Sequence, residues 1–581
     1  MATSDNHGEK RFWFGPLDRR GLIAGWRSGQ LVSLAVGVLM ALGVLSSAPS
    51  LQGMFLALLC VSSSLAFAVW PVKGRTPEQW LPVVMSWLLS TVTRRSKWSS
   101  SLPLEGRLAL VDRSVMDDPI TGNGSSGSAG QYRIASPMSP MSFHPGIERS
   151  QPVTVGPTKL LDRMRPSNLW PSPFSTLSRC TVLSLPAGVD GSSIGVVADP
   201  YMHTCSAVLR VRSSGFMLKD EAEQYEAVTR WGRILASAAQ QGRELHRLQW
   251  LVRSYPSQVT PLGCHLLNEA AAPLASPQAR SYEALIDTAE RDALSSETLL
   301  VVSLRPPGNA FTSFTKNIQG KARFSIQNSL LQEISALTAD LTTAGITTDG
   351  ALSPSELLAS LQRYIGRNRE TCSCRGSGGG LEGRSGLERK CPPCFARYDE
   401  LRLNHSPDNL HRALPLGTQA SWSELRVDGT WHATYWIAEW PRSAVMAEFL
   451  APLLLETGTW RSVSIVMEPV PPVLAIRQIE QQHTARLADD ELKRRGGFLR
   501  TARERLEKEM LLQKEAELAC GHGQYRFVGY VTASGWSKEA LDRACNRVEH
   551  LASQCFLEIR RMYGVQDTAF TYSLPLARGL T

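Results

Sequence analysis

Residues 30–80 open with the run Gln30-Leu-Val-Ser-Leu-Ala-Val-Gly-Val-Leu-Met-Ala-Leu-Gly-Val-Leu45, turn at Ser46-Ser-Ala-Pro-Ser50, and continue as Leu51-Gln-Gly-Met-Phe-Leu-Ala-Leu-Leu-Cys-Val-Ser-Ser-Ser-Leu-Ala-Phe-Ala-Val-Trp70. Neither apolar run contains an acid or a base, and each approaches the roughly 20 residues that a helix needs to cross a bilayer. Lysines and arginines flank the pair on both sides, as in segments that stay in the cytoplasm. We predict a two-helix transmembrane hairpin at 30–70 with both chain ends cytoplasmic.

Two other interpretations of these runs stay open: a buried helix pair in a soluble protein, and a cleaved signal peptide. Adjacent uncharged runs with basic flanks are rare in soluble cores, and the apolar part begins later than in a signal peptide. Trp26 and Trp70 stand at the ends of the hairpin, where amphipathic rings prefer the membrane interface. We therefore predict both as membrane anchors of a multi-pass protein of the cell membrane.

The rest of the chain has the composition of a globular protein. The whole chain of 581 residues carries a formal net charge of +9, with 43% hydrophobic and 20% charged residues. No apolar run of spanning length follows residue 100, so the remainder is predicted to be cytoplasmic, as is the basic tail at 1–29. The basic excess suits anionic lipid as well as nucleic acid. Eleven scattered cysteines indicate a reducing compartment rather than a disulfide scaffold.

An amphipathic helix follows the hairpin, within the predicted connector at 71–113. Trp80 and Trp87 share an apolar face of this helix, Arg75 precedes it, and Pro82 should kink it. An apolar face with tryptophans beside a membrane segment is typical of a helix that lies in the interface. We predict Arg75, Trp80 and Trp87 as further membrane anchors; the alternative is an ordinary amphipathic helix docked on protein.

Composition divides the remaining chain into four parts. Residues 114–158 are rich in Gly, Ser and Pro and are predicted to be a disordered linker. Residues 159–367 alternate strand and helix patterns and form a first α/β cytoplasmic part. A Cys- and Gly-rich insertion occupies 368–396. Residues 397–581 read as β-α-β, β-α-β, the ferredoxin-like arrangement, with an added helical hairpin. The predicted fold class is α+β.

Three elements of the last part have clear local signals. Val473–Leu518 is strongly helical and charged, and Gly496-Gly497 should break it into two helices. Ser537 should cap a helix that runs to about Tyr563. Ala569–Leu574 is predicted to be the final strand.

The insertion offers one candidate metal site. Cys372-x-Cys374 and Cys391-x-x-Cys394 are two close pairs, and four thiolates can bind zinc tetrahedrally. The first pair is one residue tighter than usual, so the alternative is a surface insertion with incidental cysteines. We predict no other cofactor. Gly378-x-x-x-x-Gly383-Arg384-Ser385 lacks the lysine, the preceding strand and the following helix of a phosphate-binding loop.

No catalytic constellation is apparent in the sequence. The histidines lack ligand spacing, and the common nucleophile, dinucleotide-binding and metalloprotease motifs are missing. Acidic pairs fall in the linker and on a charged helix, where solvation explains them. We therefore predict a scaffold rather than an enzyme.

The ending Tyr563-Gly-Val-Gln-Asp-Thr-Ala-Phe570 and Ser573-Leu-Pro-Leu-Ala-Arg-Gly-Leu580 resembles the segment that precedes the ATPase domain in VirB-type ATPases of type IV secretion. The strand at Gly529-Tyr-Val-Thr532 and the helix after it are also similar to that family. The front resembles the PrgI-type two-helix membrane component of the same machines. Together with Gly74-Arg-Thr-Pro-Glu-Gln-Trp80, the chain resembles a family of actinobacterial conjugation-associated membrane proteins.

This resemblance implies an inner-membrane scaffold of a type IV secretion-like DNA-transfer apparatus. The implied partners are the lipid bilayer, a separate hexameric type IV secretion ATPase and other membrane subunits. The chain stops where a motor would begin, so no nucleotide site is carried over. The charged helices around Arg494–Glu517 are the favoured dock for the ATPase. Two alternatives remain: an EccE-like membrane component of type VII secretion, and a membrane-bound nucleic-acid-binding protein.

Overall fold

The computed structural model describes residues 28–47, 50–69, 77–92, 96–99, 173–186, 193–213, 215–240, 242–256, 276–278, 280–282, 285, 294–315, 321–365, 414–415, 417–441, 443, 445–495 and 502–580. Three helices and a short strand come first: α1 (Ser28–Ser47), α2 (Leu51–Val69), α3 (Pro77–Val92) and β1 (Lys97–Ser99). The remaining described elements belong to a mixed helix-and-strand body, so the predicted α+β class is confirmed.

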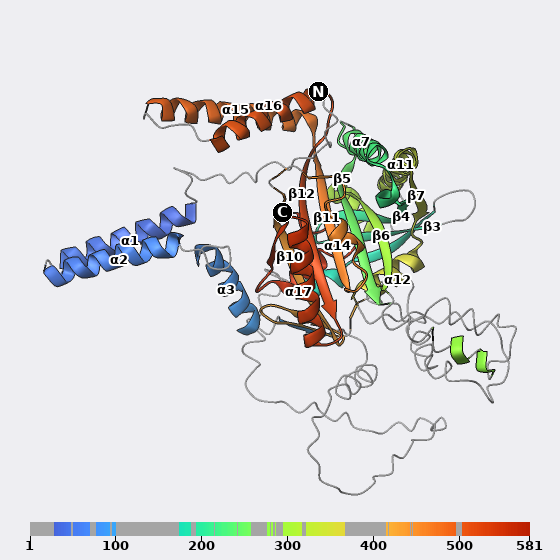
Figure 1. The fold of residues 1–581 in the computed structure, drawn as a ribbon, viewed down its shortest axis with the longest axis horizontal. Coiled ribbons are helices and arrows are strands. Elements are labelled where there is room, and N and C mark those ends of the chain that lie inside the picture. Colours follow the sequence, from blue (N-terminus) through green and yellow to red (C-terminus); the bar gives the residue numbers. More distant parts are fainter. Residues whose placement is uncertain are drawn as a thin grey trace, which may run out of the picture. The chain divides into compact units, whose positions relative to one another are not determined.

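The described strands form an antiparallel sheet, with spatial order β1-β8-β9-β10-β12-β11-β5-β6-β4-β3-β2 (Figure 1). Its first half holds β2 (Thr181–Pro186), β3 (Ser193–Asp199), β4 (Thr204–Ser213), β5 (Leu245–Pro256), β6 (Leu294–Leu304) and β7 (Ile346–Ala351). Its second half holds β8 (Gly417–Ala420), β9 (Leu425–Val427), β10 (Thr430–Glu439), β11 (Arg461–Val470), β12 (Gln524–Gly535) and β13 (Glu558–Arg561).

The second half repeats the strand order of the first. From the centre outward the first half runs β5-β6-β4-β3-β2 and the second runs β11-β12-β10-β9-β8. The last strand of each half pairs beside the same neighbour, β7 with β4 and β13 with β10. The halves join where β5 pairs antiparallel with β11, around Leu251 and Ser464. Two similar units therefore meet at the middle of one sheet, a repeat that the sequence did not reveal for the first half.

Helices cover both faces of the sheet. One face carries helices from both halves: α7 (Glu221–Ala238), α10 (Gly308–Thr315), α11 (Lys321–Thr343), α14 (Ala451–Leu455) and α17 (Lys538–Gln554). Val463 lies in the core under α17 and pairs directly with Val252 of β5, so this face is continuous across the midline. The other face carries α6 (Pro173–Leu177), α12 (Pro354–Ile365), α18 (Gln566–Thr571) and the carboxyl-terminal segment.

The helical hairpin inserted between β11 and β12 has the predicted form. α15 (Pro472–Arg495) and α16 (Ala502–Ala519) flank the predicted break, whose residues lie outside the described part of the chain. In the first half, the sequence pattern predicts helices near 219–241, 321–344 and 353–367, which the structure shows as α7, α11 and α12. Strand patterns precede the first two of these helices and correspond to β2–β6, whereas β7, directly before α12, is not predicted. The pattern also predicts a helix over 443–455, where the structure shows the shorter α14.

Two predictions at the end of the chain are wrong. The helix that Ser537 caps ends at Gln554, not near Tyr563, because the backbone turns at Phe556 and continues as β13. The predicted strand Ala569–Leu574 is instead largely helical, as α18. The free side of β10 is already occupied by β9 and β13, so no edge remains there for a further strand.

Candidate functional site

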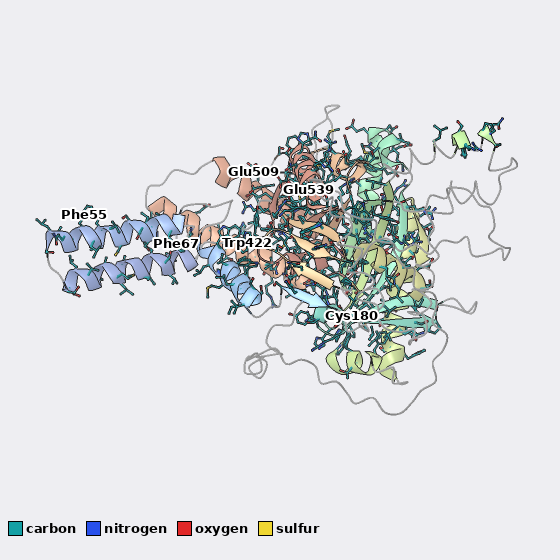
Figure 2. The ribbon with its side chains drawn as sticks, turned by 90° about the horizontal axis from the view of Figure 1, so that it is seen from below. Phe55, Phe67, Cys180, Trp422, Glu509 and Glu539 are labelled. Carbon is teal, nitrogen blue, oxygen red and sulfur yellow. The ribbon has the colours of Figure 1, made fainter. Side chains whose placement is uncertain are left out.

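The α1–α2 hairpin exposes an uncharged apolar surface. Gln30–Ser47 and Leu51–Ala68 each have the length and composition of a membrane span, and only 11% of each is buried. Large side chains point outward along both helices, with Leu51 86% exposed and Phe55 69% exposed (Figure 2). Exposed contiguous apolar surface of this kind marks an interaction site rather than a soluble surface. The hairpin is therefore the first candidate functional region.

Small and polar residues line the contact between the two helices. Gln30 Nε2 donates to Ala68 O at 2.9 Å, and the Ser64 hydroxyl donates to Ser33 O. A Cβ added at Gly37 would lie 2.4 Å from Ser64 Cβ, so the helices approach too closely there for any larger residue. Small residues and interhelical hydrogen bonds are how helices associate in lipid. Gln30 and Ser64 therefore face the partner helix, and large apolar side chains such as Leu51 and Phe55 face outward.

Helix α3 attaches the hairpin segment to the body through an aromatic cluster. The Trp80 and Trp87 rings lie 5.8 and 5.2 Å from the Trp422 ring, and Trp80 lies 5.8 Å from Tyr563. A Cβ at Gly564 would meet Trp422 at 2.8 Å, so this glycine permits the close approach. Directly after α3, β1 pairs antiparallel with β8. We call Trp80, Trp87, Trp422 and Tyr563 the aromatic dock.

The structure thus brings two of the predicted anchor residues together. Trp80 and Trp87 pack on protein, as in the docked alternative for this helix, and their rings are half-buried. Trp26, Trp70 and Arg75 lie outside the described residues, and so do Cys372, Cys374, Cys391 and Cys394. Within the described part of the chain, no group of three or more His, Cys, Asp or Glu is placed to hold a metal ion.

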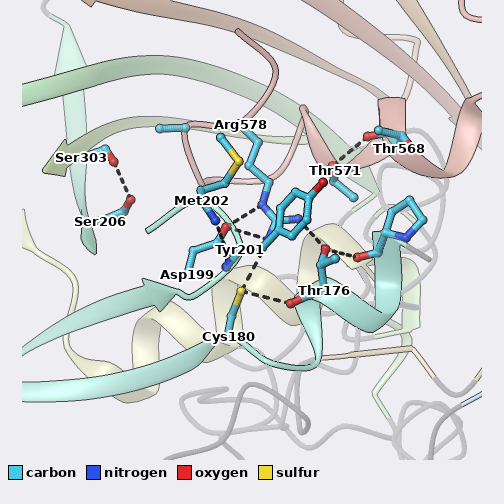
Figure 3. A network of polar contacts seen from close by, with 12 residues as sticks. Thr176, Cys180, Asp199, Tyr201, Met202, Ser206, Ser303, Thr568, Thr571 and Arg578 are labelled. Atoms are coloured by element: carbon cyan, nitrogen blue, oxygen red, sulfur yellow. Dashed lines mark hydrogen bonds and ion pairs between the residues drawn. The ribbon is translucent and has the colours of Figure 1, made fainter. Parts of the chain in front are cut away.

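A buried ion pair holds the carboxyl-terminal segment against the first half of the sheet (Figure 3). Arg578 Nε donates to Asp199 Oδ2 at 2.7 Å, and its Nη1 donates to the Thr176 hydroxyl at 3.2 Å. The Cys180 thiol lies 3.6 Å from Arg578 Nη2. Burial, with Asp199 nearby, raises the pKa of this thiol far above its usual value, so it stays protonated and unreactive. The network fixes the carboxyl-terminal segment to β3 and α6.

Polar side chains at the sheet midline hold the same segment. Arg247 donates through Nε to Glu468 at 2.8 Å and through its other nitrogens to the carbonyls of Ala577 and Leu580. Gln249 donates to Leu574 O at 2.9 Å and accepts from Ala577 N at 2.7 Å. The segment Tyr572–Leu580, which we call the strap, is therefore hydrogen-bonded across the junction of the two halves.

His432 lies buried in the second half. Its Nε2 is 2.9 Å from the Thr430 hydroxyl and its Nδ1 is 2.8 Å from the Ser534 hydroxyl. Thr430 donates its own proton to Val427 O, so His432 Nε2–H donates to Thr430 and Nδ1 accepts from Ser534. Burial, with a smaller contribution from Arg253, lowers the pKa of His432 to about 3. This neutral, fully hydrogen-bonded ring is a core residue.

Arg253 ties α12 to the sheet. Its guanidinium lies over the rings of Tyr255 and Tyr364, 4.9 and 4.0 Å from their centroids, and donates to Arg363 O in the last turn of α12. Burial lowers the pKa of Arg253 to about 10. The arginine stays charged at neutral pH and caps the Arg363 carbonyl, which lies in the last turn of the helix.

The α15–α16 hairpin, the predicted dock for a partner, carries exposed leucines among its charges. Leu487 on α15 and Leu512 on α16 are about half-exposed, whereas Ile479 and Leu511 are buried. Arg495 pairs with Glu491 one turn away on the surface. The buried residues hold the hairpin, and the exposed leucines are available for contact.

Sequence reasoning missed Trp422, His432 and Asp199, which join distant segments and have no local motif. Tyr563 and Arg578 entered only through the resemblance of the chain ending. One local signal existed: Arg578 is the single charge in the otherwise uncharged run 573–580. No protein-family model matches the chain, and no curated protein resembles it at a significant level.

Proposed function

We propose that this protein is a non-enzymatic inner-membrane scaffold of a type IV secretion-like conjugative DNA-transfer apparatus. The observation that carries the membrane part is the α1–α2 hairpin, whose helices are uncharged and apolar and have only 11% of each span buried. Such a pair is stable in hydrocarbon, where backbone groups are satisfied within each helix. Both chain ends then lie in the cytoplasm, and the bilayer is the first partner.

The rest of the proposal concerns the body. Each half links two parallel strands through a helix with one strand between them, as β10-α14-β11 with β12 in the gap. We take both halves as ferredoxin-like units. Such units host many functions, so the secretion role rests on the resemblance of the chain front and ending. In this proposal a separate hexameric ATPase and other membrane subunits bind the body.

A scaffold role agrees with the chemistry of the described residues. Three of the buried polar groups there bond to other elements of the fold: Arg578 to Asp199, His432 to Ser534 and Arg253 to the last turn of α12. Each of these groups stabilises a junction between elements.

The α15–α16 hairpin is the proposed dock for the ATPase. The test is a mild-detergent pull-down of the tagged full-length protein with mass spectrometry of the recovered proteins. We expect a type IV secretion ATPase in near-stoichiometric amount. The double variant Leu487→Glu and Leu512→Glu should lose it, because both side chains are exposed and charge would disrupt an apolar contact.

The matched control is Leu218→Glu, at a 91% exposed leucine before α7 in the first half. This variant should keep the ATPase. Recovery of type VII core subunits instead would favour the EccE-like alternative, and recovery of nucleic acid without protein partners would favour the nucleic-acid binder. Either result would contradict the scaffold proposal.

A further inference from the structure

Helix α3 has two apolar faces, and the described residues of the body cover only one of them. Trp80, Val84 and Trp87 recur at helical spacing, and the two tryptophans form the aromatic dock with the body. A neighbouring face carries large exposed apolar side chains at the same spacing: Leu81 (59%), Met85 (51%), Leu88 (44%), Leu89 (58%) and Val92 (79%). No charged residue lies between Trp80 and Val92.

This second face is continuous with the hairpin surface along the chain. Only residues 70–76 separate α2 from α3, and α3 contacts both α1 and α2. At 16 residues α3 is about 24 Å long, which is too short to cross a bilayer comfortably. Arg94, Arg95 and Lys97 follow directly. An apolar helical face followed by basic residues, beside a membrane hairpin, has the chemistry of a helix in the plane of an anionic leaflet.

We propose that the Leu81–Met85–Leu88–Val92 face of α3 lies in the cytoplasmic leaflet while its tryptophan face holds the body. The inference rests on the membrane part of the proposed function. It replaces the membrane role predicted from the sequence for Trp80 and Trp87. The tryptophans bind protein, and the aliphatic face binds lipid. The helix then joins bilayer and sheet directly, and its dock on Trp422 and Tyr563 sets which edge of the body faces the membrane.

The test places a photo-crosslinking benzophenone amino acid at single positions of the full-length chain. The chain is reconstituted in nanodiscs of phosphatidylglycerol and phosphatidylethanolamine. Position 88 tests the inference, position 55 on the hairpin is the lipid reference, and position 218 on the body is the aqueous reference. We expect lipid adducts at 88 within about twofold of those at 55, and roughly tenfold above those at 218. Unchanged limited-proteolysis patterns would show that each variant is folded.

The outcomes separate this inference from the proposal beneath it. Lipid adducts at 55 but not at 88 would overturn the inference and leave the hairpin in the membrane. Crosslinks from 88 to a second copy of the chain would also overturn it. An absence of lipid adducts at both positions would overturn the membrane anchor itself.

Discussion

The two halves of the sheet fill equivalent positions differently. Ser206 is the third residue of β4 and bonds to Ser303 on β6 at 3.0 Å. The third residue of β10 is His432, which bonds to Ser534 on β12 at 2.8 Å. Both pairs are buried and directly opposite in register. The same strand arrangement therefore accommodates either a serine–serine pair or a histidine–serine pair at this position, provided that each polar group in the pair has a partner.

The same contrast appears where the second outer helix of each half ends. The second residue after α11 is Gly345, with φ +78°, and the second residue after α17 is Phe556, with φ +55°. Around Phe556, the amide of Leu557 bonds to Ala552 O and that of Phe556 to Ser553 O, which closes the helix in a Schellman motif. Nothing in the structure explains the exposed phenylalanine. The comparison shows that backbone geometry repeats while side chains diverge.

The largest expected effect concerns the strap that joins the halves. Arg578→Ala should lower the free energy of unfolding by about 3–5 kcal/mol, because it leaves Asp199 buried without its cation. The two side chains are only 6% and 3% exposed and lie 2.6 Å apart. Urea unfolding of the detergent-solubilised full chain measures this loss.

The control for Arg578→Ala is an exposed ion pair in the first half of the sheet, the half that contains Asp199. Arg212 and Asp349 also lie 2.6 Å apart, but with 69% and 37% of their side chains exposed. Arg212→Ala should change the free energy of unfolding by less than about 0.5 kcal/mol. Equal losses in the two variants would contradict a special role for the strap.

The second expected effect is a pH dependence of stability. It comes from His432 in the second half, where the first half has Ser206 at the equivalent position. His432 has a pKa of about 3 in the fold and about 6.5 when unfolded, so the unfolded chain binds the extra proton between these values. The contribution of His432 to the free energy of unfolding is therefore fully present above pH 6.5 and decreases as the pH drops below that value. His432→Ser, which copies Ser206, should remove about 2 kcal/mol of the stability difference between pH 7 and pH 5.

Urea titrations of the chain and this variant at both pH values provide the measurement. A His432→Ser chain that loses stability on acidification as steeply as the parent would show that other groups dominate.

The smallest expected effect comes from substituting Gly345 and Phe556, the second residues after the ends of α11 and α17. Gly345→Ala should lower the free energy of unfolding by about 1 kcal/mol, and Phe556→Gly should raise it by about as much. A Cβ at Gly345 would meet no atom within 4 Å, so the loss comes from the backbone alone. Thermal midpoints would show opposite shifts. Shifts of the same sign would mean that Phe556 makes a stabilising contact.

Local signals in the sequence were enough for most elements. The hairpin runs, the two charged helices and the Ser537 cap all appear where propensity and periodicity placed them. The wrong predictions depend on tertiary contacts. β13 is four residues long and follows a helix ending that usually needs glycine, so with Phe556 at that position the sequence did not indicate the turn. The packing of Trp80 and Trp87 on Trp422 has no local signal, because Trp422 lies far along the chain.

The repeat itself escaped sequence analysis for a related reason. Equivalent strands share a place in the sheet but few side chains, as Ser206 and His432 illustrate. Burial can be met by many apolar residues, and polar partners can be exchanged in pairs, so a repeated fold need not leave a repeated sequence.

The register of the sheet also sets the order in which the chain can fold. Trp98 pairs with Thr418, Leu251 with Ser464, and Arg578 reaches back to Asp199. Contacts between such distant residues cannot form until the later partner has been synthesised, and they slow folding. The hairpin leaves the ribosome long before β8 exists to receive β1. The strap follows both halves in the chain, so its contact with Asp199 forms only after both halves have been synthesised.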